Sequence, residues 1–249
     1  DATQDAPNVA EVIAVTAEGV TSTPADEKTV YVQKAGTNDT ITLTATSGPV
    51  PFPADSVSWT GAAEHADDQT KADFSIGTVS TNQDGTPVTA TCGASSVTIN
   101  IVVIQVTLAS VGFTGDHMIT RWPGGDKIDN PDGSTAVWAT GVSDPVSYTK
   151  GTAPTMFATF TVQPALTDDV GGVQIRAMDG TTDVGSINNV TLSGTAANDG
   201  ANADDDVDGI GGGSAPPTCD AVRVANRVFN WEILFDSGTT WRSIGSSSH

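Results

Sequence analysis

The chain has 249 residues, of which 30 are acidic and 10 are basic, and its formal net charge is -20. Such an acidic chain repels phosphate backbones and anionic membrane surfaces, so nucleic acid is excluded as an expected partner. Charged residues make up 16% and aromatic residues 6% of the sequence, a composition that favours short strands and turns over long amphipathic helices.

The sequence contains no apolar stretch near the ~20 residues that a membrane-spanning helix needs, and no apolar core of a signal peptide. It begins at Asp1 rather than at a methionine. We therefore expect a mature, secreted product, located outside the cell or at its surface and not inserted into a membrane.

Residues 1–28 are predicted to form an N-terminal tail that carries one strand. Residues 9–15 are apolar on both faces apart from Glu11, which predicts a strand that needs cover on two sides. Its large apolar residues are Val9, Val12, Ile13 and Val15. Either this strand is donated to the sheet of a second copy, which would make it a self-assembly element, or it forms an edge strand of its own domain.

Residues 29–107 are predicted to form the first β-sandwich. Residues 29–32 and 40–46 alternate apolar and polar side chains on either side of the turn signal at 36–39, which predicts an antiparallel hairpin. The alternation returns around Trp59 and again in residues 88–92. Short strands at regular spacing are typical of a sandwich.

The segment 96–111 is predicted to be one strand that serves two cores. Val97, Ile99, Ile101 and Val103 occupy one face, and the apolar positions then move to the even-numbered residues Ile104, Val106 and Leu108. Because side chains alternate along a strand, this change moves the buried side to the opposite face. We therefore expect a continuous strand that joins two domains rigidly.

The order of these features resembles bacterial immunoglobulin-like modules of the Big or PKD type. It consists of Trp59 on a mid-domain strand, the late strand Val88-Thr-Ala-Thr-Cys-Gly93, and then Ser96-Val-Thr-Ile-Asn-Ile101. The resemblance implies a β-sandwich in which Trp59 packs against Cys92, and a place in a large secreted surface protein. The early strand has no second cysteine, which removes the family's usual disulfide. The resemblance implies no chemistry.

Residues 108–249 are predicted to form a second β-sandwich. Phe229, Trp231, Ile233 and Phe235 fall on one face of a strand, and residues 156–162 alternate in the same way. These aromatic side chains could form a platform for sugar stacking, but strict alternation favours a core position for Phe229 and Trp231. The following segment, Asp236-Ser-Gly-Thr-Thr-Trp241, predicts a hairpin turn without a catalytic role.

An acidic loop at 198–214 contains a candidate calcium site. Asp204, Asp206 and Asp208 stand at positions one, three and five of a loop with glycine at position six, a spacing that oxygen-ligand calcium loops use. Position twelve is Ala215 instead of the glutamate of an EF-hand. A looser calcium loop and a solvated acidic loop therefore remain the two interpretations.

The chain has two cysteines, Cys92 and Cys219. They could form a disulfide in an oxidising compartment and tie the two halves together, or Cys92 could be a small core residue and Cys219 a free thiol in a loop. The histidines His65, His117 and His249 are scattered, and Asp116 beside His117 is only a weak acid-base candidate. We expect no enzyme.

Together these patterns predict an all-β protein of two tandem immunoglobulin-like antiparallel β-sandwich domains joined by a continuous strand. The expected function is that of a structural subunit of an extracellular filament, sheath or adhesive surface assembly, in which the main partner is a second copy of the chain. The alternative is a β-sandwich module of a secreted protein that binds calcium or a surface carbohydrate.

Overall fold

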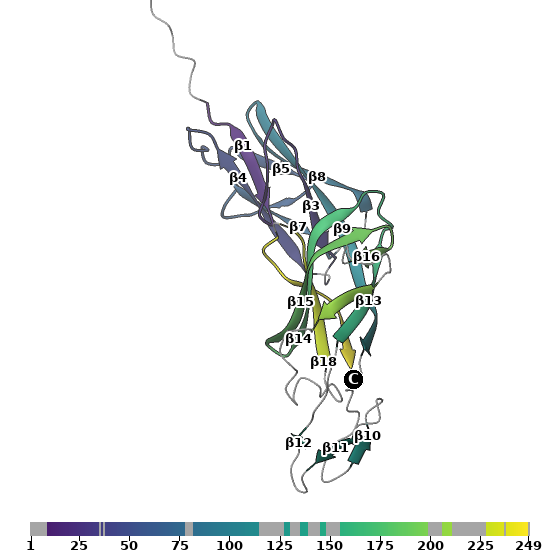
Figure 1. Ribbon diagram of the computed structural model, residues 1–249. Helices are drawn as coiled ribbons and strands as arrows, with labels where there is room; N and C mark the ends of the chain where they lie inside the picture. The colour runs from purple at the N-terminus through teal and green to yellow at the C-terminus, as the bar shows by residue number, and fades with distance from the viewer. Residues whose placement is uncertain are drawn as a thin grey trace, which may run out of the picture. The chain divides into compact units, whose positions relative to one another are not determined.

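The computed structural model describes residues 9–34, 36, 38–77, 82–114, 127–129, 135–138, 145–147, 155–198, 206–210, 228–236 and 238–248. These residues form strands and turns without a helix, which confirms the predicted all-β class (Figure 1). The described part of the chain therefore has no helix that could cross a lipid bilayer.

The chain divides into two compact units. The first unit consists of residues 1–105, 163–167 and 234–242, and the second of residues 106–162, 168–233 and 243–249. Two short segments from late in the sequence thus belong to the first unit. The alternation of apolar residues along the strands does not show that these late segments belong to the first unit.

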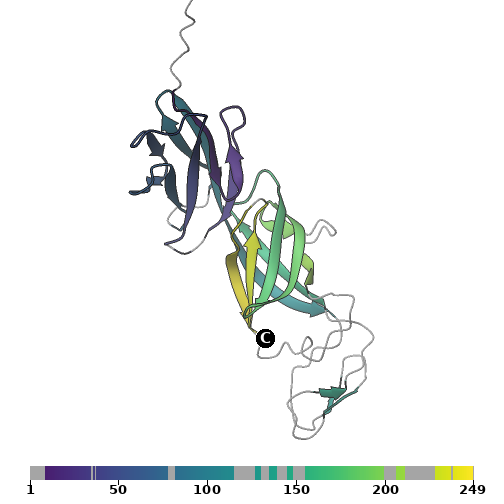
Figure 2. The same ribbon diagram turned by 90° about the vertical axis from the view of Figure 1, so that its left-hand side faces the viewer.

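Two sheets of the first unit enclose its core (Figures 1 and 2). One has the order β2 (Val20–Ser22), β1 (Val12–Ala17), β4 (Thr40–Ser47), β7 (Lys71–Ser75) and β6 (Ala63–Glu64). In the other, β9 (Ser95–Thr114) lies between β3 (Thr29–Gln33) and β8 (Asn82–Cys92), and β8 pairs with β5 (Val57–Thr60). The core takes side chains from both sheets, as period-two alternation requires.

Strand β4 illustrates why these segments form strands. Its residues Ile41, Leu43 and Ala45 are buried, whereas Thr42 and Thr46 are exposed. Burying large apolar side chains on one face stabilises the fold by ~1.5–3 kcal/mol each, and the β-branched threonines suit the solvent face.

The predicted hairpin between residues 29–32 and 40–46 is wrong. Strand β3 pairs in parallel with β9, with Val30 opposite Ile101, whereas β4 pairs with β1 and β7 in the other sheet. A short turn is present in the connection, where the amide of Asp39 donates to the carbonyl of Gly36 over 2.9 Å. Alternation shows which face of a strand is buried but does not identify its partner, and here the connection crosses between layers.

Strand β9 changes its buried face as predicted. Val97, Ile99, Ile101 and Val103 are buried on one face, and Val102, Ile104 and Val106 are buried on the other, while Gln105 and Thr107 are exposed. The four consecutive residues 101–104 are therefore covered on both faces. The boundary between the two units falls within this strand, between Gln105 and Val106.

Strand β1 lies within a sheet of its own chain, between β2 and β4, which corresponds to the intramolecular alternative. Val12 and Val15 are buried in the core of the first unit. Val9 and Ile13 remain 61% and 43% exposed. One face of the apolar segment is therefore buried in the core, whereas the large apolar side chains of Val9 and Ile13 remain exposed to solvent.

The second unit contains most of a long sheet whose order is β19 (Arg242–Ser248), β18 (Val228–Leu234), β14 (Val170–Asp179), β15 (Thr182–Ser193), β16 (Ala196–Asn198), β13 (Thr155–Gln163) and then β9. Strand β17 (Asp206–Ile210) pairs with β13. A separate small sheet has the order β10 (Lys127–Asp129), β11 (Thr135–Trp138) and β12 (Pro145–Ser147).

Aromatic residues form the centre of the second unit. Trp231 is fully buried and meets Phe160 edge to face, with ring centroids 5.7 Å apart and an interplanar angle of 68°. The indole Nε1 of Trp231 donates to Ser247 Oγ over 3.1 Å, which satisfies its polar atom. Phe229 is also buried, so the predicted core positions of Trp231 and Phe229 are confirmed.

Candidate functional site

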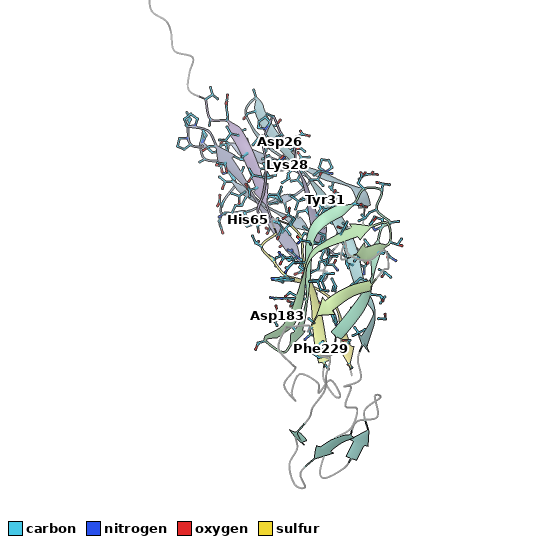
Figure 3. All side chains as sticks on the ribbon, in the orientation of Figure 1. Asp26, Lys28, Tyr31, His65, Asp183 and Phe229 are labelled. Carbon is cyan, nitrogen blue, oxygen red and sulfur yellow. The ribbon has the colours of Figure 1, made fainter. Side chains whose placement is uncertain are left out.

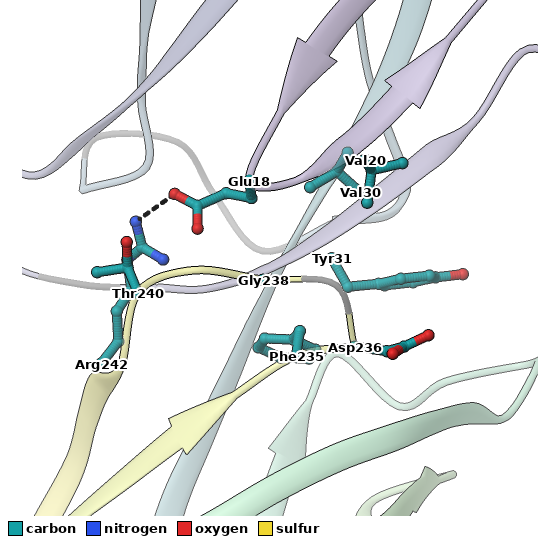
Figure 4. A pocket seen from close by; sticks show the side chains of 9 residues that line it. All are labelled: Glu18, Val20, Val30, Tyr31, Phe235, Asp236, Gly238, Thr240 and Arg242. Atoms are coloured by element: carbon teal, nitrogen blue, oxygen red, sulfur yellow. Dashed lines mark hydrogen bonds and ion pairs between the residues drawn. The ribbon is translucent and has the colours of Figure 1, made fainter.

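The ion pair of Glu18 and Arg242 lies in a hollow of the first unit (Figure 4). The hollow is shallow and opens to solvent, with a cavity volume of only about 10 Å³. Three segments line it: the β1–β2 turn, strand β3, and the connection between β18 and β19. The lining residues are Glu18, Val20, Val30, Tyr31, Phe235, Asp236, Gly238, Thr240 and Arg242.

An ion pair joins Glu18 to Arg242 at one side of this hollow. The guanidinium nitrogen Nη2 of Arg242 donates to Glu18 Oε1 over 2.9 Å, and these two residues are 224 positions apart in the sequence. Their side chains are only 11% and 12% exposed, respectively. Each group has therefore lost most of its hydration, and removing one partner would leave the other as a poorly solvated charge.

Glu18 also occupies an unusual backbone conformation. Its φ angle is +47° and that of Gly19 is +80°, and these two residues form the turn between the paired positions Ala17 and Val20. A two-residue hairpin turn with positive φ at both central positions normally takes asparagine or aspartate followed by glycine. A glutamate there carries strain of order 1–3 kcal/mol, which the ion pair with Arg242 offsets.

The connection Phe235–Arg242, called here the strap, follows β18 and leads into β19. The predicted hairpin at residues 236–241 is confirmed, because it joins two neighbouring strands of the sheet. The amide of Gly238 donates to the carbonyl of Phe235 over 2.9 Å, and a Cβ at Gly238 would approach that oxygen to 2.8 Å. Phe235 is buried in the first unit, so an aromatic anchor and the Arg242 ion pair hold the two ends of the strap.

The chemistry of the hollow suits attachment better than reaction. Tyr31 and Asp236 extend toward the same side in Figure 4, away from the ion pair. The charges of Glu18 and Arg242 neutralise each other, and the rest of the lining combines the apolar residues Val20, Val30 and Phe235 with the polar groups of Tyr31, Asp236 and Thr240. The arrangement holds the strap against the β1–β2 turn.

We predict that Glu18 and Arg242 are strongly coupled in a double-mutant cycle. Glu18→Gln and Arg242→Gln should each destabilise the protein by about 1–3 kcal/mol, and their coupling energy should be about 1–2 kcal/mol, because the pair is largely desolvated. Urea unfolding followed by circular dichroism measures these values.

The control is the exposed ion pair of Lys28 and Asp26, whose charged atoms lie 2.6 Å apart (Figure 3). Solvent screens this pair, so Lys28→Gln and Asp26→Asn should show a coupling below about 1 kcal/mol. Equal coupling energies for both pairs would contradict a special role of the Glu18–Arg242 pair.

A second polar cluster surrounds strand β7. Nε2 of His65 lies 2.9 Å from Asp73 Oδ1, and Thr42 donates its hydroxyl to the same oxygen over 2.8 Å. The His65 nitrogen is buried and has no well-aligned hydrogen-bond partner, so its contact with Asp73 is chiefly electrostatic. Figure 3 labels His65 in the first unit.

Asp68 forms a related set of contacts next to this cluster. Lys71 Nζ lies 2.8 Å from Asp68 Oδ2, and the backbone amide of Thr70 donates to Oδ1 over 3.1 Å. The hydrogen bond from Lys71 and those from Thr70 lower the pKa of Asp68 from 3.8 to about 2. The contact with His65 and the hydrogen bond from Thr42 lower the pKa of Asp73 in the same way.

These shifts predict a loss of stability in acid. A carboxyl whose pKa is lower in the folded state stabilises the fold above its unfolded pKa, and this contribution disappears as the pH falls through the folded pKa. For Asp68 the window extends from 3.8 down to about 2. Urea midpoints measured across this window should fall less steeply for Asp68→Asn and Lys71→Gln than for the wild type. Unchanged slopes in both variants would refute the assignment.

The candidate calcium site lies partly beyond the described residues. Asp204 is outside them, whereas Asp206, Asp208 and Gly209 belong to strand β17, where Asp206 pairs with Thr159 and Asp208 with Phe157. The backbone at these three positions is extended. No group of three or more potential metal ligands occurs among the side chains that the structure describes.

A calcium site at Asp204, Asp206 and Asp208 makes a direct prediction about stability. Calcium at about 100 times its Kd should raise the free energy of unfolding by about 2.7 kcal/mol, because a ligand that binds only the folded state stabilises it. Scanning calorimetry with calcium and then with a chelator measures the change in Tm. The triple variant Asp204→Asn, Asp206→Asn, Asp208→Asn should not respond, and a wild type that does not respond would exclude the site.

Cys92 is buried, with 5% of its surface exposed. Val57 is its neighbour on β5, and Trp59 pairs with Ala90 two residues away, so Trp59 and Cys92 occupy the same face of adjacent strands. Cys219 lies outside the described residues, as do Asp116, His117 and His249. The pairing of Cys92 with Cys219 stays a prediction.

Sequence reasoning missed the ion pair of Glu18 and Arg242. The dipeptide Glu18-Gly19 between two strand patterns is a weak hairpin signal, and it could have drawn attention to the turn. Nothing in the sequence indicates that Arg242 is its partner.

No model of a known protein family matches the chain, and a search of curated proteins finds no match. The resemblance to immunoglobulin-like modules therefore stays a prediction from the residues that carry it.

Proposed function

We propose that this protein is a structural subunit of an extracellular filament, sheath or adhesive surface assembly. The observation that carries the proposal is strand β9, which contributes residues to both compact units and changes its buried face near the boundary between Gln105 and Val106. A continuous strand transmits tension along its backbone, whereas a flexible linker must first be extended.

Two features of β9 support a role in bearing load. Around residues 100–103 it is paired on both edges, with β8 antiparallel on one side and β3 parallel on the other. No glycine or proline interrupts the sequence from Ser95 to Val111. Separating such a strand lengthwise requires many backbone hydrogen bonds to break together.

The ion pairs and hydrogen bonds of four polar residues also support a structural role. Glu18, Arg242, Asp68 and Asp73 are engaged in contacts that hold turns and strands together. The proposed partner is a second copy of the chain, joined by β-strand addition.

The net charge of -20 makes the proposed assembly sensitive to salt. Copies that carry this charge repel one another at low ionic strength, and the repulsion is screened within about 10 Å at about 0.1 M salt. Assembly should therefore be favoured as the salt concentration rises.

The proposal predicts polymers that can be seen directly. Negative-stain electron microscopy and analytical ultracentrifugation of the purified chain should show filaments or long oligomers at about 0.15 M salt and mostly monomers at about 0.01 M. Particles that remain monomeric at every salt and protein concentration would overturn the proposal.

A further inference from the structure

We infer that copies of this chain join by exchanging strand β1, with the Glu18–Gly19 turn as the hinge and the Glu18–Arg242 ion pair as the latch that holds the unexchanged form. The inference rests on the proposed function and names its partner and its mechanism. In the exchanged form β1 of each copy occupies the place between β2 and β4 of the next copy.

The contacts of β1 are suited to such an exchange. Val12, Val15 and Ala17 are buried, and β1 pairs through its backbone with β2 on one edge and β4 on the other. A second copy offers the same strands and the same core, so β1 can recover all of these contacts there. The exchange therefore replaces contacts within one copy by the same contacts between two copies.

The turn after β1 has the properties of a strained hinge. It consists of two residues, and Glu18 is held at a φ of +47°, where a residue with a side chain is disfavoured. When the turn straightens, Glu18 leaves this conformation and its strain is released. Short hinge loops under strain favour exchange between copies, because the exchanged form has an extended hinge.

The latch opposes this release. The carboxylate of Glu18 contacts the Arg242 guanidinium at 2.9 Å in a largely buried position, and Arg242 belongs to the strap anchored by Phe235 (Figure 4). Straightening the turn moves Glu18 away from this partner. The ion pair therefore keeps the strained turn closed until a second copy is available.

The exposed apolar residues of the N-terminal segment favour neither form. Val9, Ile13 and Val228 are the large apolar side chains left exposed among the described residues, and two of the three lie at or just before β1. Because β1 meets the same neighbours in the acceptor copy, Val9 and Ile13 stay exposed there to the same extent. The driving force for exchange is therefore the release of strain in the hinge.

Exchange of β1 in one direction produces an open chain of copies. Each copy donates one strand and accepts one strand, so the contact is head to tail and extends without closing unless a ring forms. This is β-strand addition in which the acceptor site is the position that β1 itself occupies in the separate molecule.

A mixed-cysteine experiment tests the exchange. Thr16 and Thr44 face each other on β1 and β4, and both are only partly buried. One preparation carries Thr16→Cys and the other carries Thr44→Cys, each in a Cys219→Ser background and with native circular dichroism. After assembly of the mixture and mild oxidation, exchange should link the two chains by a disulfide between the substituted positions, detected on non-reducing gels and by mass spectrometry.

The matched control uses Thr40 and Ser75, which face each other on β4 and β7. These two strands stay in the same copy whether or not β1 exchanges. A mixture of Thr40→Cys and Ser75→Cys should therefore give at least tenfold less linked dimer than the first mixture.

Two further variants test whether β1 must leave its own sheet and whether the latch slows that step. The double variant Thr16→Cys, Thr44→Cys, oxidised before assembly, fastens β1 to its own β4 and should reduce polymer at least tenfold, with recovery after reduction. Glu18→Gln keeps the strained backbone but removes the charge that Arg242 pairs with, and it should speed assembly several-fold.

The outcomes separate this inference from the proposed function. Polymer with linked chains supports both, whereas polymer without linked chains above the control level overturns β1 exchange and leaves the structural function standing. Linked dimers without polymer support the exchange and overturn the filament. The absence of both polymer and linked chains overturns both.

Discussion

The first unit depends on β9 being buried on both faces over four consecutive residues. Most strands of a sandwich bury one face and expose the other to solvent. Residues 101–104 differ, because their side chains are buried on both faces of the strand. Both edges of β9 are also paired at Ile101, with Val30 of β3 on one side and Thr86 of β8 on the other. Such a strand can shift by one residue only at the cost of exposing large apolar groups, so it sets the register of its neighbours.

Much of the fold could be predicted because burial follows the alternation of side chains. The change of face near Ile104, the core position of Trp231 and the hairpin after Phe235 could all be read from apolar spacing and turn residues. The partner of β3 could not, because Val30 and Val32 would present the same apolar face to an antiparallel β4 as to a parallel β9. Which strand becomes the neighbour of β3 depends on how all the strands pack around the core, and the pattern of one strand does not contain that information.

The candidate site was less accessible to sequence reasoning. Glu18 and Arg242 are ordinary surface residue types, and their meaning comes from a separation of 224 positions in the chain and from the burial of both side chains. The motifs that stood out in the sequence were the acidic run and the two cysteines. The burial of Cys92 opposite Val57 shows that a conspicuous residue type can occupy a packing position.

The membership of residues 234–242 in the first unit has a consequence for biosynthesis. A ribosome makes β1 to β8 long before it makes Phe235 and Arg242, and domains usually fold as their residues emerge. Here the N-terminal unit must wait, because its final segment is translated after nearly all of the second unit. During that delay Glu18 in the β1–β2 turn lacks its partner Arg242, and Val30 lacks the neighbouring side chain of Phe235. Because the second unit in turn includes residues 243–249, neither unit is complete until almost the whole chain has been translated.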